Sequence, residues 1–159
     1  MNKSTQQCYL ASLIFLASIF DLALAAGGGD GGGVATGRKI DPILAPVIEF
    51  IEDAQYKKAV DAGKVALSES PDNADLLNLI AYSYRNLEQK EFALEYYLLA
   101  LTIEPDHRGA NEYLGELYLQ TDRLELALER LAVLDDECFF PCKEYTDLKK
   151  AIETYQQAQ

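Results

Sequence analysis

The residues with the clearest capacity for chemistry are two cysteines near the C-terminus. Cys138 and Cys142 lie in the stretch CFFPC. A pair at this spacing can form a structural disulfide, work as a redox couple, or supply two of the four ligands that structural zinc requires. A third cysteine, Cys8, lies in an N-terminal segment that we expect to be removed. An even number of cysteines in an exported chain favours a disulfide, which would join the end of one helix to the start of the final helix.

Other catalytic and metal-binding groups are scarce. His107 is the single histidine and lies far along the chain from CFFPC, so zinc would lack a full ligand set. We expect His107 to be an exposed residue at a joint between helical units. The acidic pairs Glu52–Asp53 and Asp135–Asp136 are typical of solvated helix ends rather than of catalytic dyads. The sequence therefore predicts a protein that is not an enzyme and that has no metal and no cofactor.

The overall charge argues against a nucleic-acid partner. The chain of 159 residues carries 14 basic and 26 acidic side chains, which gives a net charge of −12. Such a surface repels phosphate backbones, although it can attract a cationic segment of another protein. Hydrophobic residues make up 49% of the chain, which is enough for one packed domain.

The N-terminus is typical of an export signal. One lysine precedes the apolar run CYLASLIFLASIF, and Ala23 and Ala25 follow at the spacing that a signal peptidase accepts. We predict a signal peptide over residues 1–25, with cleavage after Ala25. A retained membrane anchor is the alternative, but Asp21 would place a carboxylate in the hydrocarbon. The protein is therefore expected to be exported to the periplasm of a Gram-negative bacterium, with no stable membrane span after cleavage.

Residues 26–39 are rich in glycine, and we expect them to form a flexible linker. A repeat follows. The stretch FALEYYLLALTIEPDH, residues 92–107, echoes KAVDAGKVALSESPDN, residues 58–73, at an offset of 34 positions. Apolar residues recur in it at helical spacing, and each run stops at a proline, Pro71 or Pro105. The sequence thus predicts helical hairpins over residues 40–73, 74–107 and 108–141.

The first of these hairpins has a weaker pattern than the others. Its opening stretch, DPILAPVIEFIEDA, contains Pro42, which a helix start tolerates, and Pro46, which would bend or shorten the helix. We therefore expect an irregular beginning to the first helix.

The units resemble tetratricopeptide repeats, a family with a 34-residue helix–turn–helix pattern. The middle unit meets this pattern at eight positions: Leu77, Ile80, Ala81, Tyr84, Ala93, Tyr97, Ala100 and Pro105. The other units depart from it, with Gly63 in a position for a bulky residue, Asn111 in an apolar position and Phe139 in place of the final proline. The resemblance implies an all-α fold, an α-solenoid of three hairpins over residues 40–158.

A stack of hairpins leaves one apolar face open, so a terminal capping helix is expected. Residues 143–157 supply it, because Tyr145, Leu148, Ile152 and Tyr155 fall on one face of a helix.

The family resemblance also implies a protein-binding concave face, formed by the first helix of each unit. On this basis the predicted partner-binding residues are Asn78, Tyr82, Arg85, Asn86, Glu112, Glu116 and Gln120. Members that grip the C-terminal carboxylate of a chaperone need basic residues where this chain has Glu112 and Glu116. A protein or peptide partner that carries basic residues fits this surface better.

Three roles stay open at this point. The first is a non-enzymatic adaptor or scaffold of the bacterial envelope. The ending CKEYTDL, with Cys138 before it, resembles small exported bacterial proteins with these repeats whose role is unassigned. The second is a redox or metal-handling accessory protein that uses Cys138 and Cys142. The third is a structural role in an envelope assembly, with self-association through the terminal helix.

Overall fold

The structure is a computed structural model that describes residues 41–159, all of which belong to one compact unit. The predicted signal peptide over residues 1–25 and the linker over residues 26–39 lie outside the described residues.

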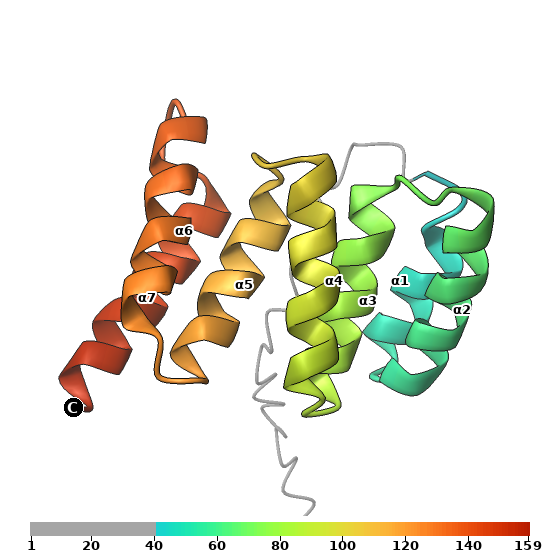
Figure 1. The fold of residues 1–159 in the computed structure, drawn as a ribbon, viewed down its shortest axis with the longest axis horizontal. Helices are drawn as coiled ribbons and strands as arrows, with labels where there is room; N and C mark the ends of the chain where they lie inside the picture. Colours follow the sequence, from blue (N-terminus) through green and yellow to red (C-terminus); the bar gives the residue numbers. More distant parts are fainter. Residues whose placement is uncertain (1–40) are drawn as a thin grey trace, which may run out of the picture. The chain divides into compact units, whose positions relative to one another are not determined.

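Seven helices and no strand occur in this part of the chain (Figure 1). They are α1 (Ala45–Glu52), α2 (Tyr56–Glu69), α3 (Ala74–Asn86), α4 (Lys90–Ile103), α5 (Arg108–Leu119), α6 (Leu124–Glu137) and α7 (Lys143–Gln157). Consecutive helices pack against each other in chain order, and α7 packs on both α5 and α6. The predicted all-α solenoid of three hairpins with a terminal capping helix is therefore confirmed.

The same turn joins the two helices of every hairpin. Ala54, Glu88 and Asp122 follow one another at the 34-residue offset, and their φ angles of 54°, 58° and 57° all lie in the left-handed region. In the middle hairpin, the amide of Gln89 then donates to the carbonyl of Tyr84 at 3.0 Å, as in a common helix C-terminal motif. The repeat in the sequence is thus a repeat of backbone conformation.

The first hairpin begins irregularly, as its prolines predict. A turn that includes Pro42 precedes α1, with the amide of Leu44 donating to the carbonyl of Asp41 at 2.9 Å. Pro46 lies in the first turn of α1, where its missing N–H removes no helical hydrogen bond. The helix is only eight residues long.

Small residues allow the helices to approach closely. Ala59, Ala93 and Ala127, one in the second helix of each hairpin, are all fully buried. Gly63 replaces the bulky residue of the pattern because α2 lies against Ile80 of α3. A Cβ at Gly63 would come within 2.5 Å of the Ile80 side chain, so a larger residue would overpack this contact.

The capping helix α7 docks on α5 through a similar close approach. Leu148 is fully buried and Ile152 is 4% exposed. A Cβ added to Gly115 of α5 would come within 2.6 Å of Leu148. This contact closes the apolar end of the stack, which is the role that the pattern of α7 predicts.

The expectation that His107 is exposed is wrong, and the polar residue Asn111 occupies its apolar position for a clear reason. The side chain of His107 is 10% exposed rather than open to solvent. Its Nδ1 accepts from the amide of Ala110 at 3.1 Å and so caps α5, while Nε2 contacts Asp75 at 3.1 Å. Asn111 is fully buried in a position for an apolar residue, because its amide nitrogen donates to the carbonyls of Pro105 and His107.

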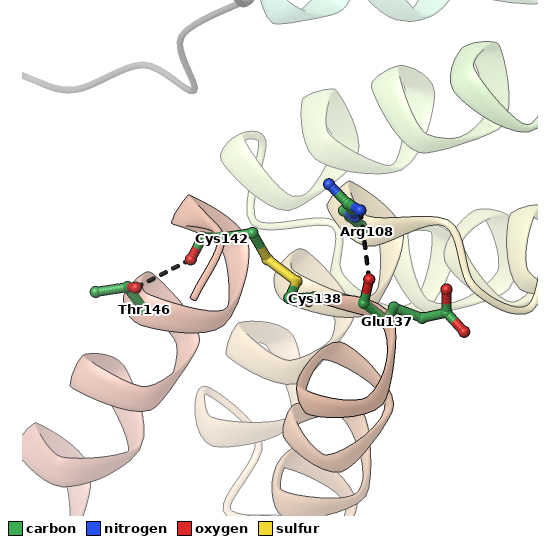
Figure 2. Close-up of a disulfide and its surroundings, with 5 residues drawn as sticks. All are labelled: Arg108, Glu137, Cys138, Cys142 and Thr146. Carbon is green, nitrogen blue, oxygen red and sulfur yellow. Dashed lines mark hydrogen bonds between the residues drawn. A yellow bond between two sulfur atoms is a disulfide. The ribbon is translucent and has the colours of Figure 1, made fainter. Parts of the chain in front are cut away.

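A disulfide joins Cys138 and Cys142, with their Cα atoms 5.7 Å apart. It closes the loop that links the end of α6 to the start of α7 (Figure 2). The predicted disulfide, between helix end and capping helix, is therefore present.

Candidate partner-binding surface

The first-helix surface is the face on which side chains of α3 and α5 meet. Helical spacing places Asn78, Tyr82 and Arg85 on one side of α3, and the structure places this side next to α5. The guanidinium of Arg85 donates to Oε2 of Glu116 at 2.5 Å. Two of the predicted site residues, one from each of two neighbouring hairpins, are thus directly paired.

Aromatic rings surround this ion pair. The ring of Tyr82 lies 5.1 Å from that of Tyr113 and 6.3 Å from that of Tyr56, measured between centroids. The guanidinium carbon of Arg85 lies 5.6 Å from the Tyr82 ring and 5.3 Å from the Tyr113 ring. These distances are typical of cation–π contacts. We refer to Tyr56, Tyr82, Arg85, Tyr113 and Glu116 as the tyrosine–arginine cluster.

The cluster rests on buried polar groups. Tyr97 of α4 is fully buried, and its hydroxyl makes no hydrogen bond of normal geometry with any described residue. Burial raises the pKa of Tyr97 far above its usual value, although the nearby charge of Arg85 opposes this rise. Burial also disfavours the charged form of Arg85, but Tyr97 and Glu116 outweigh it and leave the pKa of Arg85 raised. Arg85 is therefore a permanent cation beneath two tyrosine rings.

Glu112 lies deeper than a surface contact residue. It is 6% exposed, on the side of α5 that faces α7. Burial, together with the carboxylates of Glu116 and Asp147, raises the pKa of Glu112 to about 8, although Lys143 opposes the rise. At neutral pH this carboxyl group is therefore mostly protonated, and a cation placed beside it would favour its ionised form.

Asn78 is also more buried than the prediction implied. It is 8% exposed, and its Oδ1 has no hydrogen-bond partner among the described residues. Its Nδ2 lies opposite Gly109, where an added Cβ would come within 3.0 Å. Asn78 and Glu112 are therefore buried polar residues beneath the first-helix surface rather than exposed contact residues on it.

The two remaining predicted residues are exposed and lie at helix ends. Asn86, the last residue of α3, donates from its side chain to the carbonyl of Tyr82 at 2.9 Å. Gln120 follows α5 as its C-cap residue. Of the seven predicted residues, the structure brings Tyr82, Arg85 and Glu116 into contact, and Gln120 meets Glu116 through its backbone amide, which donates to the Glu116 carbonyl at 3.0 Å.

Comparisons with known proteins identify the fold through solved structures. No family model matches the chain, and a search among curated proteins finds no significant match. Among solved structures, the tetratricopeptide repeat domain of Sgt2 from Aspergillus fumigatus superposes with a TM-score of 0.64 and 24% identity, over 73% of this chain and 76% of that one. The described residues have the tetratricopeptide fold.

Two bacterial structures with this fold are also similar. The type III secretion translocator chaperone SycD from Yersinia enterocolitica matches with a TM-score of 0.62 and 12% identity, over 73% of this chain and 87% of that one. MamA from Desulfovibrio magneticus matches with a TM-score of 0.56 and 20% identity, over 60% of this chain. The chain spans 54% of the length of that MamA chain.

Within this tetratricopeptide fold, three aromatic residues of the site were missed by the sequence analysis. Tyr56 comes from the first turn of α2, Tyr97 from α4, and Tyr113 lies one residue beyond Glu112. The family pattern assigns partner contacts to a few positions of the first helices, which include neither Tyr56 and Tyr97 of second helices nor Tyr113 of α5. The 34-residue offset pairs Tyr56 with Lys90 and Tyr113 with Leu79, so the repeat pattern carries no signal for either tyrosine.

Neither a metal site nor a membrane span is present in the described part of the chain. No group of three or more histidine, cysteine, aspartate or glutamate side chains within residues 41–159 is arranged to hold a metal ion. None of the helices in this range has the length and apolar character needed to cross a bilayer.

Proposed function

We propose that this protein is a non-enzymatic adaptor that binds a protein or peptide carrying lysine or arginine on its first-helix surface. The observation that supports this proposal is the pair of buried polar groups beneath that surface. Asn78 Oδ1 has no partner in the described residues, and Glu112 is held protonated by burial and by neighbouring carboxylates. A buried polar atom without a partner is unfavourable, and a ligand whose donor group reaches Asn78 Oδ1 would satisfy it.

The charge around Glu112 favours a cationic ligand. Glu116, Asp147 and Glu144 all act on Glu112, against one opposing cation, Lys143. Glu116 is paired with Arg85 and Asp147 with Lys143, so Glu144 supplies the remaining negative charge. A lysine or arginine of the partner would meet more negative than positive charge here, and the rings of Tyr82 and Tyr113 would contact its alkyl chain.

Protein binding is also in line with the structural neighbours, one of which is a chaperone for a secretion translocator. The disulfide between Cys138 and Cys142 favours a structural role for the two cysteines, and it is in line with an oxidising compartment. We therefore extend the proposal to an adaptor of the bacterial envelope, exported to the periplasm after cleavage of residues 1–25.

The test is a binding measurement with matched variants. A partner is captured from the periplasmic fraction of the source bacterium, identified and purified, and its affinity for the chain is measured by calorimetry. Tyr82→Ala and Glu116→Gln should each weaken binding by about tenfold or more, which corresponds to about 1.4 kcal/mol.

Glu95→Gln is the matched control, because Glu95 is exposed on α4 of the same hairpin. It should leave the affinity unchanged. Retained affinity in both Tyr82→Ala and Glu116→Gln, with folding verified by circular dichroism, would remove the first-helix surface as the binding site.

A further inference from the structure

The loop between α6 and α7 presents two aromatic rings to solvent. Phe139 is 93% exposed and Phe140 is 76% exposed. Their ring centroids lie 4.9 Å apart in an edge-to-face arrangement, so the two rings form one apolar projection. We refer to Cys138–Cys142 as the aromatic loop.

Several contacts hold the aromatic loop in place (Figure 2). The disulfide closes it, the side chain of Arg108 donates to the carbonyl of Glu137 at 3.4 Å, and the hydroxyl of Thr146 donates to the carbonyl of Cys142 at 2.9 Å. A loop that is ordered before binding loses little conformational entropy on association. The two rings are therefore suited to enter an apolar surface of another molecule.

Such an apolar surface exists on the same chain. Phe92, Tyr96, Leu99 and Ile103 fall on one side of α4 at helical spacing, and we refer to them as the α4 stripe. Phe92 is 51% exposed, Leu99 45% and Ile103 37%.

The α4 stripe is peculiar to the middle hairpin. The 34-residue offset assigns Lys58, Ala62, Val65 and Glu69 to the same positions in the first hairpin, and Leu126, Arg130, Val133 and Glu137 in the third. Both of these sets contain charged residues, whereas the α4 stripe contains none. The repeat itself therefore does not require an apolar surface here, and exposed apolar area of this kind commonly marks an interaction site.

The two features differ in the charge beside them. The aromatic loop directly follows Asp135, Asp136 and Glu137, which are all exposed. Beside the α4 stripe lies a cation, Lys64 of α2. Its Nζ lies 5.2 Å from the ring of Tyr84, which in turn stacks on Phe92 at 5.2 Å.

Glu95 falls on the opposite edge of the stripe by its helical spacing from Phe92 and Leu99. An acidic loop would therefore approach the α4 stripe from the side of Lys64.

We propose that the aromatic loop of one copy of this protein docks on the α4 stripe of a second copy. Phe139 and Phe140 would cover the stripe, and Asp135 and Asp136 would lie near Lys64. The loop and the stripe both stay exposed within a single chain. A copy therefore does not cover the stripe with its own loop. The acidic residues beside the loop favour this occupant over an anionic lipid surface.

The proposed contact is head-to-tail. Each copy offers one loop and one stripe, which leads to an open row or a closed ring of copies rather than to a two-fold dimer. Two rings packed on one helix face bury only a small interface area, so the association should be weak. It should be detected at high protein concentration.

The test uses the chain without the predicted signal peptide, residues 1–25, which keeps all described core residues. Its mean mass is measured by sedimentation at rising concentration, up to about 1 mM. The mass should rise with concentration in the parent. It should stay that of a monomer in a loop variant, Phe139→Asp with Phe140→Asp, and in a stripe variant, Leu99→Asp.

The decisive measurement mixes the two variants. The loop variant keeps an intact stripe and the stripe variant keeps an intact loop, so an equimolar mixture should form a one-to-one pair although each variant alone is monomeric. Leu98→Asp is the matched control, because Leu98 is 46% exposed but lies off the stripe. It should associate as the parent does, and Lys64→Glu should weaken the association.

Three results would overturn the proposal. One is a parent that is monomeric throughout the concentration range. Another is a mixture of the two variants that remains monomeric. The third is binding of the monomeric parent to vesicles of phosphatidylethanolamine and phosphatidylglycerol, lost in the loop variant, which would assign the loop to a membrane instead.

Discussion

The first-helix surface and the α4 stripe deviate from ordinary burial in opposite directions. The first-helix surface buries polar side chains, among them Asn78 and Glu112, whereas the α4 stripe exposes apolar ones, among them Phe92 and Leu99. Both arrangements are unfavourable for an isolated chain, because buried polar groups lose hydration and exposed apolar groups order water. Neither is needed to stack helical hairpins, so the two surfaces are better explained by contacts that the protein makes with other molecules.

The two surfaces also differ in how the chain itself treats them. The capping helix α7 packs on α5 beside Glu112, whereas no described segment covers the α4 stripe. Substitutions on the first-helix side should therefore change the free energy of unfolding, and substitutions on the stripe should mainly change association.

The largest effect is expected where α7 meets α5. Leu148→Ala would leave a cavity over Gly115 and should lower the free energy of unfolding by about 2–5 kcal/mol. Leu99→Ala removes the same atoms from a side chain that is 45% exposed, and should cost less than about 1 kcal/mol. Urea denaturation monitored by circular dichroism measures both. Equal losses in the two variants would show that the two surfaces do not differ in packing.

A second comparison concerns charge. Arg85→Ala should lower the free energy of unfolding by about 2–3 kcal/mol, because it leaves Glu116 without its partner beneath the tyrosine rings. Lys57→Ala is the matched control, since the Lys57–Asp61 pair lies in solvent, with side chains 84% and 68% exposed. It should change stability by less than about 0.5 kcal/mol. A small effect of Arg85→Ala would mean that the tyrosine–arginine cluster is solvated.

The fold could be predicted because the features that define it lie close together in the sequence. The 34-residue offset relates Ala59, Ala93 and Ala127, and all three are buried where paired helices meet. Helical spacing in residues 143–157 likewise predicted a face with Leu148 and Ile152, both of which are buried against the stack. Local periodicity is sufficient for these predictions, since each element repeats the same packing rule.

The details of the site could not be predicted in the same way. The burial of Glu112 depends on where α7 crosses α5, which is a distance between elements rather than a spacing along one of them. His107 was expected to be exposed, but it caps α5 and contacts Asp75, which lies 32 residues earlier in the chain. Pairs of this kind require the crossing geometry of two hairpins, and helical periodicity does not contain it.

The smallest expected effect is a pH dependence that comes from Glu112. Its pKa rises from 4.5 to about 8 on folding. Below pH 4.5 both the folded and the unfolded states hold the proton. Between pH 4.5 and 8 the unfolded state releases it while the folded state retains it, so the stability of the parent falls as the pH rises through this window. The glutamine of Glu112→Gln has no such proton to release, so this variant should lose no stability through this pH window.

The pKa shift corresponds to about 3–4 kcal/mol between pH 5 and pH 8. Relaxation of the folded state around the ionised carboxylate lowers this, so the stability of Glu112→Gln relative to the parent should increase by about 1–2 kcal/mol. Denaturation midpoints at the two pH values measure this difference, with Glu95→Gln as the exposed control that should show no such change. If the stability difference between Glu112→Gln and the parent is the same at both pH values, Glu112 is hydrated. The argument for a cationic ligand would then lose its main support. A cationic peptide that binds beside Glu112 should lower its pKa and reduce the same difference, which connects this measurement to the partner itself.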